Sequence, residues 1–163
     1  MRSFADRTAE ILASSMSRQQ KARSLAQLVQ LERDFHWVGL YDVSQTDISA
    51  IAWTGESSPA FPSFPVTKGI NGVAVAEKRP VLVQDVSKDP RYLTTFGETK
   101  AEAIFPVYSG EGRVVGTIDV ESDRMDAFGS EEEIFLVQCA SLLAPLWNAE
   151  QGAAGAMRRT PAP

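Results

Sequence analysis

The chain has 163 residues, of which 44% are hydrophobic and 23% are charged, the usage of an ordinary globular domain. Its formal net charge is −5 and its Lys and Arg residues are scattered, which argues against a nucleic acid partner. Its apolar runs are too short to span a bilayer, and its charged N-terminus is unlike a signal peptide. Its single cysteine allows no internal disulfide. We therefore expect a cytoplasmic protein.

The N-terminal part predicts helix followed by a β-hairpin. Apolar residues recur at helical spacing through residues 4–34, and Ser15 or Ser17 could divide this stretch into two helices. From residue 35 the period changes to two, which predicts a strand over residues 35–42. A turn-forming composition follows, and residues 48–54 are the predicted partner strand.

The middle of the chain is less regular. Residues 57–65 are rich in Pro and Ser and are interpreted as a connection. Glycines open residues 68–80 and a proline closes them, which predicts a short helix that starts at a tight turn. Residues 81–85 predict a brief strand, and residues 87–100 an irregular segment.

The C-terminal part predicts a second hairpin and a last helix. Strands are expected over residues 101–108 and 113–121, joined by a Gly-rich loop. Ser130 followed three residues later by Glu133 predicts a capping box that opens the helix. Its apolar face includes Cys139, which we interpret as a packing residue, because free cysteine is among the most buried residue types.

This order of elements predicts one α+β domain over residues 1–149, with residues 150–163 as a disordered tail rich in Ala, Gly, Arg and Pro. We expect an antiparallel sheet whose N-terminal and C-terminal helices pack on one face. The short helix and the irregular segment then form a roof over the other face, with a ligand pocket beneath them.

Five side chains are candidates for that pocket. Asp119 and Glu121 are two residues apart and so share a face of their strand, and Glu102 on the partner strand could face them. Together they would suit a cationic or hydrogen-bond-donating ligand, although the face could instead be simply solvated. Trp37 and Tyr41 share one face of the first strand and are either pocket walls or ordinary core.

Three further residues allow a functional or a structural interpretation. Asn71 and Gly72 could present backbone N–H groups to a ligand, or serve only the geometry of the turn. His36 is expected to be partly buried beneath the terminal helices, and it has no Ser and Asp partners at a spacing that would favour a hydrolase.

Several stretches resemble GAF domains, namely residues 68–74, residues 79–86, residues 103–107 and residues 114–122. The resemblance covers about residues 4–147 and implies the GAF fold. Within that family the chain is similar to the stand-alone free methionine-(R)-sulfoxide reductases. Residues 35–41 resemble their first strand. Glu102, Asp119 and Glu121 match their carboxylate positions, the last being Asp in that family.

The resemblance also marks a departure. Asn71 and Thr95 stand where the reductases carry cysteines, and neither can replace a thiolate. We therefore expect a ligand-binding, sensory or regulatory GAF domain for a small polar or zwitterionic ligand, with no cofactor and no metal ion. The alternatives are a reductase, or an interaction module with an empty pocket. Lacking an output domain, it would dimerise or bind a protein partner through its terminal helices.

Overall fold

The computed structural model describes residues 1–148, and the predicted tail over residues 150–163 lies outside them. The helices are α1 (Phe4–Ala13), α2 (Arg18–Arg33), α3 (Gly69–Glu77) and α4 (Ser130–Leu143), with a 3₁₀ turn η1 (Val86–Lys88). The strands are β1 (Trp37–Val43), β2 (Asp47–Trp53), β3 (Ser63–Pro65), β4 (Val81–Val83), β5 (Ala101–Tyr108) and β6 (Val114–Ser122). They form one antiparallel sheet in the order β3-β2-β1-β6-β5-β4.

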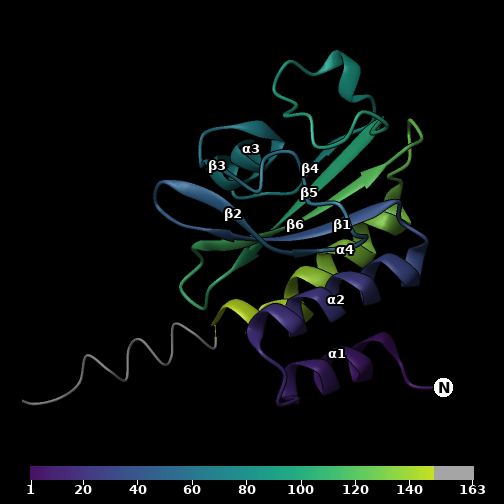
Figure 1. The fold of residues 1–163 in the computed structure, drawn as a ribbon, viewed down its shortest axis with the longest axis vertical. Coiled ribbons are helices and arrows are strands. Elements are labelled where there is room, and N and C mark those ends of the chain that lie inside the picture. The colour runs from purple at the N-terminus through teal and green to yellow at the C-terminus, as the bar shows by residue number, and fades with distance from the viewer. Residues whose placement is uncertain (149–163) are drawn as a thin grey trace, which may run out of the picture.

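The sheet separates two different layers (Figure 1). Helices α2 and α4 pack on one face with α1 outside them, whereas α3 and the segment before β5 lie over the opposite face. This arrangement confirms the predicted α+β architecture, with the terminal helices on one side and a roof on the other. None of the helices in the described part of the chain is long and apolar enough to cross a membrane.

The N-terminal helical stretch divides at serine, as the sequence predicts. The Ser17 hydroxyl accepts from the backbone N–H of Gln20 and the Gln20 side chain accepts from the Ser17 N–H, a complete capping box. Helix α2 ends at Asp34, which adopts the left-handed conformation at φ 53° and turns the chain into β1.

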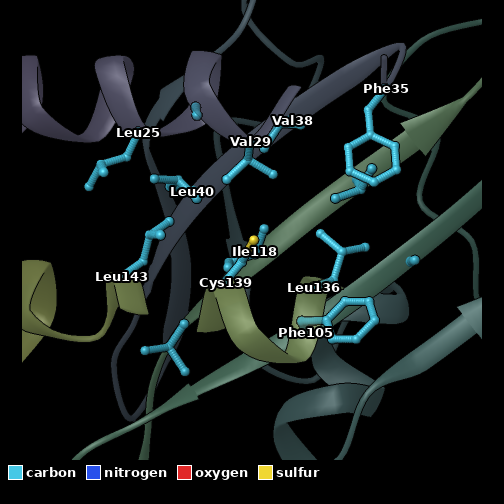
Figure 2. Packing of buried hydrophobic residues seen from close by; sticks show 14 of the residues in the cluster. Leu25, Val29, Phe35, Val38, Leu40, Phe105, Ile118, Leu136, Cys139 and Leu143 are labelled. Atoms are coloured by element: carbon cyan, nitrogen blue, oxygen red, sulfur yellow. The ribbon is translucent and has the colours of Figure 1, made fainter. Parts of the chain in front are cut away.

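The main hydrophobic core lies between the sheet and the helices (Figure 2). Side chains from α2, such as Leu25, and from α4, such as Leu136, meet those of β1 and β6. Cys139 is 0% exposed among them, and burial raises the pKa of its thiol. The interpretation of Cys139 as a packing residue agrees with this position.

Two predicted elements need correction. Helix α4 is capped by Gly129, whose N–H donates to the Glu132 carboxylate at 2.9 Å, so the box of Ser130 and Glu133 is wrong by one residue. Hydrogen bonds just upstream fix the chain before this earlier start. The Gln84 side chain donates to the carbonyl of buried Phe128 and accepts from its backbone N–H. The helix therefore starts one residue earlier than the polar pattern suggests.

The connection over residues 57–65 also contains a strand, β3, that the sequence analysis missed. It pairs with β2 at the edge of the sheet, where a proline is tolerated, and only Phe64 of its three residues is buried. A three-residue strand is too short to show a period of two. It matters for the site because Phe64 packs against Tyr41, with ring centroids 6.0 Å apart.

Candidate functional site

Adjacent strands bring three carboxylates together on the roof face of the sheet. Glu102 on β5 lies directly opposite Glu121 on β6, and Asp119 is two residues away on the same face. Carboxylate oxygens of all three lie within 4.8 Å of one another. Glu102, Asp119 and Glu121 are only 3%, 2% and 0% exposed, so the alternative of a solvated face is wrong.

A short hydrogen-bond network anchors two of these acids. The Asn71 amide donates to Asp119 Oδ2 at 2.9 Å and accepts from the Thr117 hydroxyl at 2.6 Å. The Thr99 hydroxyl donates to Glu121 Oε2. Asn71 therefore reaches the cluster through its side chain, across a separation of 48 residues, whereas the sequence suggested a backbone donor.

One oxygen of each acid stays without a partner among residues 1–148: Glu102 Oε2, Asp119 Oδ1 and Glu121 Oε1. Burial raises the pKa of all three carboxyls. The charges of Asp119 and Glu121 raise the pKa of Glu102 further, and the charge of Glu121 raises that of Asp119, while hydrogen bonds from Asn71 and Glu102 lower the pKa of Asp119. The cluster is thus a set of buried, mutually repelling acceptors that favours protons or a cation.

The aromatic residues of β1 lie beside the acids. In the pairing of β1 with β6, Trp37 is opposite Glu121 and Gly39 is opposite Asp119. A Cβ on Gly39 would lie 2.3 Å from the Trp37 ring and 2.9 Å from the Tyr41 ring, so only glycine lets the two rings close over this position. Both rings are buried, at 5% and 2% exposed.

The two aromatic side chains differ in what they contact. Tyr41 lines a small cavity next to the acids, and burial followed by the charge of Asp119 raises the pKa of its phenol. Trp37 does not line this cavity and instead packs edge-on against Phe96 at 5.4 Å. Its indole N–H has no partner in the part of the chain that the structure describes.

The cavity itself is nearly closed. Its volume is about 10 Å³, close to the minimum that holds one water molecule. Its lining residues are Tyr41, Phe61, Phe64, Gly69, Ile70, Asn71, Leu93, Thr95, Glu102 and Asp119. Of these, Phe61 is 46% exposed and so reaches the surface. The structure therefore brings Tyr41, Asn71, Thr95, Glu102 and Asp119 to one cavity.

Of the two roles considered for Gly72, the structure agrees with the geometry of the turn. The Gly72 N–H donates to the Lys68 carbonyl at 3.0 Å, so this N–H is occupied within α3 and is not a free donor for a ligand. A Cβ at Gly72 would lie 2.8 Å from both the Val66 oxygen and the Thr67 carbonyl carbon. Glycine is needed here for the close approach of α3 to the preceding backbone.

His36 does not line the cavity, and its predicted partial burial is wrong. It precedes β1 and is exposed, with its two ring nitrogens 3.8 Å from carboxylate oxygens of Glu98 and Asp123.

Thr117 and Thr99 bond to the cluster although they were not predicted as site residues. The spacing of Thr117 from Asp119 could have revealed the first, whereas Thr99 lies in an irregular segment without a usable pattern.

The model of one family, described as GAF domain, matches residues 22–147 of the chain. The chain belongs to the GAF domain family. It is 29% identical over 110 residues to GAF domain-containing protein A of Dictyostelium discoideum, covering 68% of each chain. It is 29% identical over 111 residues to the free methionine-R-sulfoxide reductase of Saccharomyces cerevisiae. That match covers 68% of this chain and 62% of the yeast protein, just under two thirds of its length.

Solved structures agree with this assignment. The type II free methionine-R-sulfoxide reductase of Thermoplasma acidophilum has a TM-score of 0.73 and 30% identity, over 80% of this GAF domain and 94% of that chain. The reductase of Neisseria meningitidis, solved with its substrate, has a TM-score of 0.80. The match covers 92% of this chain and 89% of the Neisseria chain. At 21% identity, that match shows the common fold alone.

The similarity to reductases does not extend to a thiol at the cavity. Cys139 is the only cysteine in the sequence, and it lies in the core between α4 and the sheet (Figure 2). The carboxylate cluster lies on the opposite face of that sheet. The cavity is lined by Asn71 and Thr95, the two positions where the family resemblance led us to look for cysteines.

Proposed function

We propose that this GAF domain binds a small polar or zwitterionic ligand, as a sensory or regulatory module, and that Glu102, Asp119 and Glu121 anchor it. The observation that carries the proposal is the buried cluster, in which each acid has one oxygen without a partner. Leaving such acceptors unsatisfied costs about 1–3 kcal/mol each, and more when they are charged. A ligand ammonium group would offset this cost, because it supplies both hydrogen-bond donors and a positive charge.

Binding an organic ligand would require the roof to open, because a cavity of about 10 Å³ holds no more than a water-sized group. Leu93 and Thr95 line the cavity from the segment before β5, and Phe61 lines it from the connection between β2 and β3. Displacement of these two connections would enlarge the cavity without disturbing the sheet. Tyr41 would then form the apolar wall, with Trp37 beside it.

A thermal-shift screen of free amino acids, amino acid oxides and nucleotides in chelator-treated buffer tests this proposal. We expect at least one zwitterionic amino acid to raise the melting temperature of the wild type, since only the folded state binds it. The shift should be lost in Glu102→Gln and retained in Glu111→Gln, which changes an exposed carboxylate in the β5–β6 loop. An equal shift in both variants would contradict a role of Glu102 in binding.

The second candidate function is reduction of free methionine-R-sulfoxide, favoured by the similarity to the yeast and Thermoplasma enzymes. Incubation of the protein with that sulfoxide and a thiol reductant separates the two functions. We expect no turnover, because no cysteine lines the cavity and the pKa of the Cys139 thiol is raised by burial. Turnover that survives Cys139→Ser would show that the chemistry proceeds without a cysteine.

A regulatory role would also require a partner, and we propose a homodimer or a protein partner in the cytoplasm. The outer surface of α4 exposes Ile134 and Val137, at 61% and 47%, and α1 covers the neighbouring part of the helical layer. Light scattering after gel filtration measures the oligomeric state. Native mass spectrometry of the freshly purified protein tests the third alternative, an empty pocket, which a co-purified small molecule would contradict.

A further inference from the structure

The carboxylates of Glu102, Asp119 and Glu121 form the only group of three or more potential metal ligands found in residues 1–148. They come from two adjacent strands, β5 and β6, which pair without interruption from Ala101 to Val107. The oxygens therefore keep their spacing without support from a flexible loop. Two ligands of one Ca²⁺ ion, at 2.3–2.6 Å from the metal, are at most roughly 4.6–5.2 Å apart, and oxygens within 4.8 Å of one another are compatible with that limit.

The second observation is the free bonding capacity of these side chains. Glu102 Oε2, Asp119 Oδ1 and Glu121 Oε1 are fully buried, and none has a hydrogen-bond donor among the described residues. Neutral groups, the Asn71 amide and the Thr95 and Thr99 hydroxyls, donate to Asp119 and Glu121, and the carboxyls of Glu102 and Asp119 bond to each other. None of the ion pairs in this part of the chain includes a cluster carboxylate. The cluster thus has one open acceptor per acid and no ion-pair partner among the described residues.

The third observation is the size of the adjoining space. The cavity of about 10 Å³ is lined by two of the three acids, Glu102 and Asp119, and it accommodates one atom-sized guest. Glu121 lies next to these two acids but outside the lining of the cavity. A metal ion or a single water molecule could enter without displacing Phe61 or Leu93. An amino acid could not. The closed structure is therefore matched in size to an ion, independently of any opening of the roof.

We propose that Glu102, Asp119 and Glu121 bind one hard divalent cation, of the Ca²⁺ or Mn²⁺ class, through their carboxylate oxygens. Three carboxylates with no sulfur or imidazole donor select this class over softer metals, because oxygen donors suit Ca²⁺ and Mn²⁺ and thiolates suit Zn²⁺ and Cu⁺. The cation would offset two of the three carboxylate charges at the cluster. The ion-bound cluster would then attract a ligand ammonium group less strongly than the metal-free cluster does.

Titration of the chelator-stripped, full-length protein with MnCl₂, followed by the electron paramagnetic resonance signal of free Mn²⁺, measures this binding directly. We expect one Mn²⁺ per chain, with CaCl₂ as a competitor. Glu121→Gln and Asp119→Asn preserve side-chain size and should each weaken Mn²⁺ binding by at least about tenfold. The matched control Glu111→Gln, in the exposed β5–β6 loop, should bind as the wild type does. Circular dichroism confirms that each variant is folded.

The outcomes are distinct from those of the ligand screen, which is run without metal. Absence of stoichiometric Mn²⁺ binding at millimolar concentration in the folded wild type would overturn the cation proposal and leave the ligand proposal standing. Binding that both cluster variants retain would also overturn it, since the ion would then lie elsewhere. Loss of Mn²⁺ binding in both variants, together with a melting temperature that CaCl₂ raises only in the wild type and in Glu111→Gln, would support it.

Discussion

Replacing Glu102 by glutamine should stabilise this domain at high pH and leave it almost unchanged at low pH. The substitution keeps the size of a side chain that is 3% exposed and lies directly opposite Glu121. In the folded state the pKa of Glu102 is raised well above its ordinary value, first by burial and then by the charges of Asp119 and Glu121. In the unfolded chain the same carboxyl titrates near its ordinary value.

The sign of the effect follows from these two pKa values. A carboxyl whose pKa is raised on folding contributes its full stability below the unfolded pKa and loses it as the pH rises through the folded pKa. Between those two points the loss is about 1.4 kcal/mol per pH unit for each such group. The amide introduced by Glu102→Gln does not titrate, so the variant should gain about 1–3 kcal/mol over the wild type at pH 8. For a domain of this size that corresponds to about 2–4 °C in melting temperature per kcal/mol.

Urea unfolding followed by tryptophan fluorescence, with EDTA present and at pH values from 5 to 8, measures the free energy of unfolding of both proteins. The stability difference between Glu102→Gln and the wild type should grow with pH, whereas that between Glu111→Gln and the wild type should stay near zero. A loss of stability in Glu102→Gln that grows with pH would refute the reasoning. It would mean that the folded state stabilises the ionised form of Glu102.

Three further substitutions test the surroundings of the cluster and the core. Asn71→Ala removes a buried amide that bonds Asp119, and should lower the free energy of unfolding by about 1–3 kcal/mol in the same urea assay. Gly72→Ala places a Cβ against backbone atoms and should cost about 1–3 kcal/mol, whereas Gly110→Ala meets no atom within 4 Å and should cost little. Cys139 should react with a thiol reagent far more slowly in native buffer than in urea, and Cys139→Ser should be destabilised because it buries a hydroxyl among apolar side chains.

The convergence of the three acids was predictable in part from local rules. Alternation along β6 places Asp119 and Glu121 on one face, and the hairpin makes β5, with Glu102, the neighbour of that strand. The pairing of Glu102 with Glu121 also depends on the register shift between Val107 and Tyr108, which the sequence analysis did not predict. Their burial was not predictable in the same way. It results from α3 and the segment before β5 covering that face, and the sequence pattern alone was equally consistent with exposure.

The side-chain bond from Asn71 to Asp119 shows where the prediction stopped. The Gly-rich turn indicated a helix N-terminus, and such an N-terminus suggests backbone donors. The distance at which α3 packs over β6 decides instead that the Asn71 amide reaches the acid, and that distance depends on Gly72 approaching the Val66 carbonyl. Contacts between residues 48 positions apart depend on packing distances that no local pattern contains.

The two faces of the sheet differ in a way that makes the cluster experimentally accessible. The helix face holds the large continuous core around Leu25, Leu136 and Ile118, in which burial of each such side chain contributes about 1.5–3 kcal/mol. The roof face holds only small apolar clusters, around Ile70 and Tyr41, on either side of the acids. Because most of the apolar burial lies on the far side of the sheet, amide substitutions in the cluster should leave the fold intact. A change in ligand or metal binding in those variants can then be attributed to the carboxylates themselves.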